Sequence, residues 1–305
     1  MIETLARWIS RGIALLLIGP IAAWGVGMVH APDGSGATTL LTGSSLVSGL
    51  VALLIVAGCA WMMAGIAARL GDRHEAMLCM GFVLAWVAWS GGRLGETLRM
   101  APESGTFLRL AAEAVLFGLI VLGGLVISDR MSRRSAVDEG LGLSVGGIRA
   151  GMGGRTGVPA LLVSLVAGLG IAWLFGRNDL PGQSLGVGFL AGIAGGIAAT
   201  TLVQSMIKDE RDAPSGSAHL VVPALLGLLV AGVAGPLVGL FVPGAGKVLG
   251  LIARGTLPGW ILVSPAAWSA GALIGVPMGV SFLHSRAAND ASGSGVAGVS
   301  KVPSA

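Results

Sequence analysis

A polytopic all-α bundle that crosses a membrane about eight times is the fold class that this sequence predicts. Of the 305 residues, 54% are hydrophobic and only 11% are charged, and the mean hydropathy is +0.85. Soluble domains carry roughly 25% charged residues, so this chain has too few polar side chains to cover a surface in water. Its apolar residues also gather in eight segments, each close to the roughly 20 residues that a helix needs to cross a bilayer core.

Short polar breaks separate these segments, and each segment predicts one span. In chain order the predicted spans are Ile13–Val29, Leu46–Ala68, Met77–Gly92, Phe107–Ile127, Val158–Phe175, Leu185–Ile207, Leu220–Val242 and Leu257–Leu283. The third is the shortest. The last contains Pro265 and Pro277, and a proline inside a helix removes a backbone hydrogen bond, so we expect this span to be kinked or tilted.

The first segment has a second interpretation, which is a cleaved signal peptide. Arg7 and Arg11 give it a basic start, and Val29-His30-Ala31 resembles a small-residue cleavage site. Its apolar stretch, however, exceeds the 7–15 residues that are usual for the core of a signal peptide. We therefore expect a retained span.

The longest polar break divides the chain into two predicted four-helix halves. We predict an N-terminal four-span half (1–127), a cytoplasmic connector rich in Gly and Arg (128–157), a C-terminal four-span half (158–284) and a disordered tail (285–305). The first span of each half ends in a similar pattern, Ile21-Ala22-Ala23-Trp24 and Gly170-Ile171-Ala172-Trp173. This likeness is short and uses residues that are common in membranes, so duplication is a weaker hypothesis than the division itself.

The distribution of basic residues predicts that both termini are cytoplasmic. With the N-terminus inside, cytoplasmic segments hold about twice as many Lys and Arg residues as external ones, as the positive-inside rule requires. The Arg-rich segment after the third span fits the rule poorly, since Arg93, Arg99 and Arg109 fall on the external side. An Ala-, Gly- and Arg-rich chain without tyrosine is typical of bacteria with GC-rich genomes, so we expect a bacterial inner (plasma) membrane.

Small residues form a stripe along the sixth predicted span. Gly188, Gly192 and Gly196 recur every four residues and therefore lie on one face of a helix. Glycine at such positions lets helix backbones approach closely. We expect helix packing here, either within the bundle or with another chain, so small-residue faces are candidate surfaces for a homo- or hetero-oligomer. The alternative is a helix that slides or lines a narrow pathway.

A polar cluster follows the third predicted span. Arg93 and Glu96 lie near its end, and Arg109 and Glu113 lie four residues apart at the start of the fourth. Ionisable residues inside a span are costly and mark functional hypotheses. One interpretation is that Glu113 pairs with Arg109 and extends toward the interface. The other is an external vestibule that handles protons or anions.

Soft ligands also occur on two neighbouring spans. Cys59 and Met63 lie on the second, and Cys79 and Met80 lie on the third at similar depth. Thiolate and thioether groups select ions such as Cu(I), but Met and Cys fill apolar cores more often. We therefore expect no metal and no cofactor. The net charge of +4 follows from basic loops, so the expected partner is the lipid bilayer and not nucleic acid.

Three functional classes stay open. The leading hypothesis is a non-catalytic membrane component that scaffolds or regulates a partner, because the sequence shows no convergent set of ionisable groups at mid-membrane. It also lacks zinc-protease, nucleophile-elbow and P-loop motifs. The alternative is a small-solute or ion transporter or channel-like permease, and a membrane-embedded enzyme comes third. A transporter predicts a cavity that reaches mid-bilayer beside Glu113 or the glycine face. A scaffold predicts a closed bundle with an exposed small-residue face. An enzyme predicts at least two titratable groups gathered in a cleft.

Overall fold

The computed structural model describes residues 2–31, 34, 38–91, 93–132, 152, 156–177, 180–206, 218–242 and 244–296. All regular elements in these ranges are helices. The N-terminal half contains α1 (Ile2–Ile13), the π-helical segment η1 (Ala14–Ile18), α2 (Gly19–Val26), α3 (Leu46–Leu70), α4 (Arg73–Ser90), α5 (Leu94–Met100) and α6 (Ser104–Met131). The C-terminal half contains α9 (Gly157–Phe175), α10 (Pro181–Met206), α11 (Ala218–Gly239), α12 (Ala245–Ala253), α13 (Gly259–Leu262) and α14 (Pro265–Val296).

Seven helical stretches in the described residues are long and apolar enough to cross a membrane, which confirms the all-α multi-pass fold class. They are Thr4–Val26, Leu46–Leu70, Ser104–Met131, Gly157–Phe175, Pro181–Met206, Leu220–Gly239 and Pro265–Leu283. An eighth span requires α4 and α5 to be counted together, and these two helices meet at 43°. Helix α4 corresponds to the third and shortest predicted span, whereas α5 lies in the polar break that follows it.

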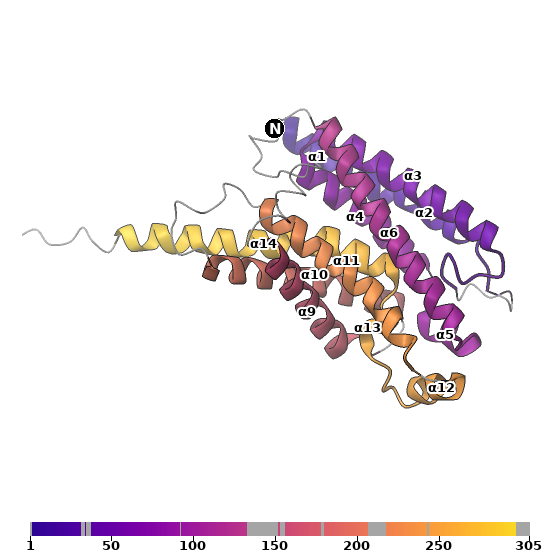
Figure 1. The fold of residues 1–305 in the computed structure, drawn as a ribbon. Coiled ribbons are helices and arrows are strands. Elements are labelled where there is room, and N and C mark those ends of the chain that lie inside the picture. Colours follow the sequence, from indigo (N-terminus) through magenta and orange to yellow (C-terminus); the bar gives the residue numbers. More distant parts are fainter. Residues whose placement is uncertain are drawn as a thin grey trace, which may run out of the picture.

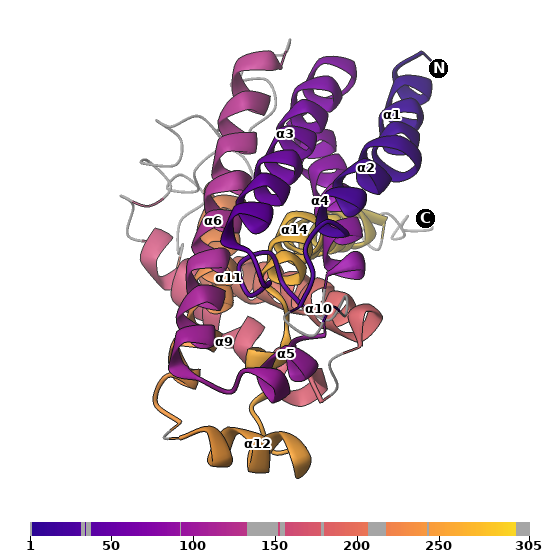
Figure 2. The same cartoon turned by 90° about the vertical axis from the view of Figure 1, so that its right-hand side faces the viewer.

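The two halves share one apolar core. Figure 1 shows α3, α4 and α6 running side by side, while α14 crosses this group at a steep angle. In Figure 2, α14 is seen nearly end-on, and α3 and α6 stand upright. Helices α9, α10 and α11 pack with one another, and α10 and α11 also pack against α14. Helices α4 and α6 contact α14 across the junction of the halves. Buried side chains from both halves belong to the same cluster.

The first span begins earlier than predicted and is interrupted by a π-helical segment. Pro20 has no backbone N–H, so the carbonyl of Leu15 cannot receive a π-type bond from it. The indole N–H of Trp86 on α4 donates to that carbonyl instead, at 2.9 Å. Gly19 leaves room for the indole, because a Cβ at this position would lie 2.8 Å from the Cγ of Trp86. The interruption is therefore stabilised by contact with α4.

One end of the bundle is closed by α5, α12 and α13, and we call it the α12 end. In Figure 2, α12 lies crosswise below the upright helices, at the end opposite the N-terminus. A separate apolar cluster joins these helices to the start of α6, and we call it the end-cap cluster. Its buried residues are Leu94, Leu98, Phe107, Leu110, Val248, Leu257, Ile261 and Leu262.

Helix α12 ends in a Schellman motif. The N–H of Gly255 donates to the carbonyl of Ile252 at 3.1 Å, and the N–H of Thr256 donates to that of Leu251 at 2.9 Å. Gly255 has a φ of +63°, a left-handed conformation that glycine adopts without a steric penalty. This turn fixes the direction in which the chain leaves α12.

The predicted tail begins too early. The sequence predicts disorder from residue 285, whereas α14 continues to Val296. Helix propagation is easier than nucleation, and the alanines at positions 287 and 288 are good helix formers, so a packed span extends into the polar segment. Residues 297–305 lie outside the described residues, as do 133–151 and 153–155 of the predicted connector.

Candidate functional site

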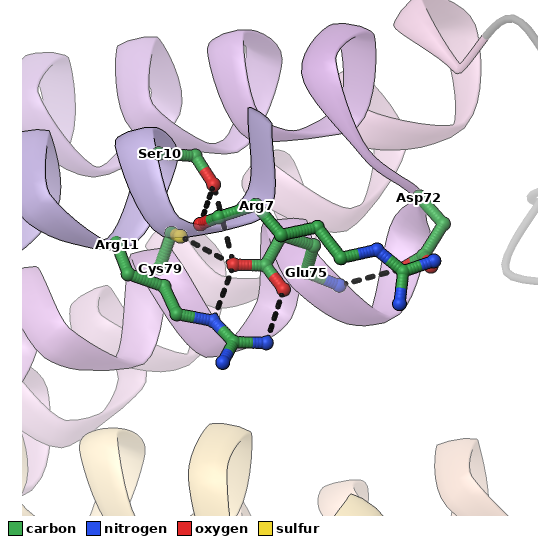
Figure 3. Close-up of polar contacts among 6 residues, drawn as sticks. All are labelled: Arg7, Ser10, Arg11, Asp72, Glu75 and Cys79. Atoms are coloured by element: carbon green, nitrogen blue, oxygen red, sulfur yellow. Dashed lines mark hydrogen bonds and ion pairs between the residues drawn. The ribbon is translucent and has the colours of Figure 1, made fainter. Parts of the chain in front are cut away.

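The most extensive polar network in the described residues joins α1 to α4 at the N-terminal end of the bundle (Figure 3). Glu75 lies at its centre, with only 2% of its side chain exposed. Arg11 donates to both carboxylate oxygens of Glu75, from Nε at 2.9 Å and from Nη2 at 2.8 Å. The hydroxyl of Ser10 donates to Oε1 at 3.2 Å, and the thiol of Cys79 approaches the same atom at 3.5 Å.

A second ion pair extends this network to the start of α4. Arg7 contacts the carboxylate of Asp72 at 3.0 Å. The other oxygen of Asp72 accepts the backbone N–H of Glu75 at 2.8 Å, so Asp72 is the N-cap of α4. Residues of α1 bind both Glu75 and Asp72. The network is therefore better suited to joining the first span to α4 than to catalysis by a general base.

Helix α6 is joined to the same end of α4. Arg73 is 3% exposed, and its guanidinium lies 2.5 Å from a carboxylate oxygen of Asp129 on α6. The start of α4 therefore has two charged side chains pointing to different neighbours, Glu75 toward α1 and Arg73 toward α6. Together they fix the position of α4 at the N-terminal end.

Sequence reasoning missed this network because it assigned the charged residues to a loop. Hydropathy places the third span from Met77, whereas α4 begins at Arg73 and carries Glu75 inside the bundle. An available signal was the spacing of basic residues on one segment and acidic residues on the other. Arg7 and Arg11 lie one helical turn apart, and Asp72 and Glu75 show nearly the same spacing.

Glu113 lies in a different environment, near the α12 end of α6. Its side chain is buried, with a relative exposure of 3%. The carboxylate accepts the backbone N–H of Leu41 at 2.9 Å, and the Thr39 hydroxyl and the Leu40 N–H also face it. Glu113 therefore holds the loop 38–42, which joins the first two spans.

The loop held by Glu113 has its own internal bonding. The hydroxyl of Thr42 lies 3.0 Å from that of Thr38 and 2.9 Å from that of Thr39, and it accepts the Thr39 N–H at 3.0 Å. All three threonines are buried. Because Glu113 and the threonines satisfy the polar groups of the loop, it can pack into the bundle at low cost.

A cavity of about 20 Å³ lies beside Glu113, where the two halves meet. Its wall includes Phe117 on α6, Ala88 on α4, and Ser264 and Ala266 at the start of α14. This volume is enough for about one water molecule. It is far smaller than a conduit for a solute.

The other residues of the predicted polar cluster lie apart from Glu113. Arg109 is exposed, and the structure, which describes both residues, shows no ion pair between Arg109 and Glu113. The predicted Arg109–Glu113 pair is therefore wrong. The physical reason is that the loop supplies N–H and O–H donors directly to the buried carboxylate. Arg93 and Glu96 form an exposed pair of their own at 2.8 Å, at the start of α5.

The predicted glycine stripe on α10 lies against a matching stripe on α14. Gly188, Gly192 and Gly196 of α10 lie over Ala267, Gly271 and Val276 of α14. A Cβ on Gly196 would lie 2.5 Å from the carbonyl oxygen of Val276, and one on Gly275 would lie 2.5 Å from that of Phe189. Both backbones are therefore in direct contact, and this face of α10 is covered from within the chain.

The α14 stripe consists of Gly271, Gly275 and Gly279, which the sequence analysis did not single out. These residues show the same four-residue spacing as the α10 stripe. The signal was therefore present in the sequence. Pairing the two stripes required knowing that α10 and α14 are neighbours.

The soft side chains point in different directions. Cys79 faces Glu75, whereas the sulfur of Met80 lies against Gly124 on α6. Cys59 and Met63 are buried on α3. No group of three or more His, Cys, Asp or Glu residues suited to a metal occurs within the described ranges.

The chain matches no protein-family model, no curated protein and no solved structure.

Proposed function

We propose that this protein is a non-catalytic component of a bacterial inner membrane that scaffolds or regulates a partner, with both termini in the cytoplasm. The interlocked glycine stripes of α10 and α14 carry this proposal. A helix pair whose backbones touch at three successive glycine positions has no space between its members for a solute. The two helices would have to separate before a pathway could open between them.

The fixed ends of the bundle support the same proposal. Ion pairs hold α1, α4 and α6 together at the N-terminal end, and the end-cap cluster joins the helices of the α12 end. A bundle fixed at both ends is suited to presenting its surface to a partner. Because the glycine face of α10 is covered by α14, the partner would need to use another part of the surface.

Flux measurements and native complex size test this proposal together. We expect proteoliposomes containing the full chain to pass protons and small ions no faster than empty liposomes. We also expect the protein extracted from its own membrane in mild detergent to migrate as a larger complex than the purified chain. Flux above that of empty liposomes, or identical migration of the two preparations, contradicts the proposal.

A transport-like role is the second candidate, and Glu113 favours it. A buried carboxylate beside a cavity at the junction of two halves is where an alternating-access protein holds a coupling ion or proton. The loop 38–42 would then act as a gate over Glu113. Flux that is present in the wild type and lost in Glu113→Gln supports this candidate, whereas flux unchanged by Glu113→Gln removes its main support.

A further inference from the structure

A hollow of about 370 Å³ lies at the α12 end of the bundle. Residues from three distant parts of the sequence line it. They are Gly95 and Arg99 of α5; Arg177, just after α9; and Ile252, Ala253, Arg254, Gly255, Leu257 and Leu262 from the end of α12 through α13. The volume falls within the range of about 300–1,000 Å³ that is usual for small-molecule pockets.

The charge of this hollow is entirely positive among its described lining residues. Arg99, Arg177 and Arg254 supply three guanidinium groups, and none of the lining residues that the structure describes is acidic. Glu96, the described acid nearest to Arg99 in sequence, pairs with Arg93. All three arginines are exposed, so water screens their mutual repulsion. Their combined positive charge favours an anion in the hollow.

Two of the three arginines, Arg99 and Arg254, lie on or directly after packed helices. The end-cap cluster buries one face of α5 and α12, so their backbones are fixed. The Nε of Arg254 donates to the carbonyl of Gly250 at 3.1 Å, which holds the side chain along α12 and leaves its terminal N–H groups for a ligand. Gly255 then turns the chain sharply into the segment that lines the far side of the hollow.

We propose that this hollow is a binding site for a phosphate-type oxyanion, held by Arg99, Arg177 and Arg254. A guanidinium group presents a planar fork of N–H donors that matches two oxygens of a phosphate at once. Two sources share this chemistry, namely a soluble phosphorylated compound and the headgroup of an anionic phospholipid. The proposal is independent of the scaffold and transport candidates, because it rests on three arginines that neither candidate uses.

The proposed site also accounts for three arginines whose positions the predicted topology leaves unexplained. Under the predicted orientation, Arg99, Arg177 and Arg254 all fall on the external side, where the positive-inside rule disfavours them. Their convergence on one hollow gives a reason for their presence that does not depend on membrane insertion.

The test uses the full chain and four variants. Arg99→Gln, Arg177→Gln and Arg254→Gln each remove one guanidinium from the hollow. Arg109→Gln is the matched control, because Arg109 is an exposed arginine of α6 that does not line the hollow. Thermal unfolding in detergent is followed against inorganic phosphate. In a second arm, native mass spectrometry counts phosphatidylglycerol retained from nanodiscs of mixed phosphatidylcholine and phosphatidylglycerol.

We expect one arm to show binding in the wild type and in Arg109→Gln, and each hollow variant to bind roughly tenfold more weakly, as the loss of one charge-assisted hydrogen bond predicts. Stabilisation by phosphate identifies a soluble ligand, and selective retention of phosphatidylglycerol identifies a lipid. The proposal is overturned if neither arm shows binding, or if Arg109→Gln weakens binding as much as the hollow variants do.

Discussion

The Cα atom of Gly275 on α14 lies 2.9 Å from the position that a Cβ atom would occupy on Gly192 of α10. Neither residue can be enlarged without moving a backbone, because each faces main-chain atoms of the other helix. The two glycines therefore determine how closely α10 and α14 approach. This contact lies at the centre of the C-terminal half, and its removal should be measurable in the stability of the whole protein.

Gly192→Ala should destabilise the protein by about 1–3 kcal/mol, the usual cost of overpacking a well-packed contact. The matched control is Gly186→Ala on the same helix, where an added Cβ meets nothing within 4 Å. Thermal unfolding in detergent measures both variants. If Gly192→Ala melts like Gly186→Ala, then α10 and α14 are not in backbone contact in the bilayer protein.

The spans were predictable because each one depends on local composition. A run of apolar residues is stable across a bilayer whatever its neighbours are, so Leu46–Ala68 was located almost as the structure has it, in α3. The start of α4 was not predictable in this way. Arg73 and Glu75 belong to the helix because Asp129 and Arg11 neutralise them, and hydropathy carries no information about such distant partners.

The candidate sites, too, could be predicted from the sequence only in part. The importance of Glu113 followed from its unusual place inside an apolar segment, but its actual donors come from Leu41 and Thr39, far earlier in the chain. The hollow at the α12 end was not foreseen at all. Arg99, Arg177 and Arg254 are unremarkable one by one, and only the tertiary fold brings them to one place.

Glu113→Leu should loosen the loop 38–42. The substitution leaves the N–H of Leu41 without its acceptor, and an unsatisfied buried group costs about 1–3 kcal/mol. Hydrogen exchange of the amides of residues 38–42 should therefore become faster, while Glu113→Gln keeps an acceptor oxygen and should protect the loop more than Glu113→Leu does. Glu103→Gln, at an exposed acid of the same region, serves as the control. Equal exchange in all three variants would show that Glu113 does not hold the loop.

Arg11→Gln should destabilise the protein by about 1–3 kcal/mol, because Arg11 is 31% exposed but its loss leaves an uncompensated buried charge. Glu75 is that charge, because it is almost fully buried beside Arg11. The double variant Arg11→Gln/Glu75→Gln should recover much of the loss, because both groups are then neutral. Glu96→Gln breaks an exposed pair and should cost less than about 1 kcal/mol. Unfolding in detergent at increasing denaturant measures all of them, and a double variant no more stable than Arg11→Gln would argue against a buried charge.

Helix α4 decides whether the chain has seven or eight spans, and therefore where the C-terminus lies. Its 18 residues rise about 27 Å, close to the thickness of a bilayer core. Its first turn contacts Arg11 at the N-terminal end, and its last turn lies beside Glu113 near the α12 end. Since α4 thus extends between the same two ends as α3 and α6, we count it with α5 as a broken span.

Eight spans require both termini to lie on the same side of the membrane. A reporter fused after Ala305 and a second one fused before Met1 should therefore both report a cytoplasmic location. A cysteine placed at Lys247, on the exposed face of α12, should react with a membrane-impermeant maleimide from the opposite side, while buried Cys59 and Cys79 stay unlabelled in the folded protein. Termini on opposite sides of the membrane would require an odd number of crossings, which means seven spans. Helices α4 and α5 would then form a re-entrant segment that does not cross the membrane.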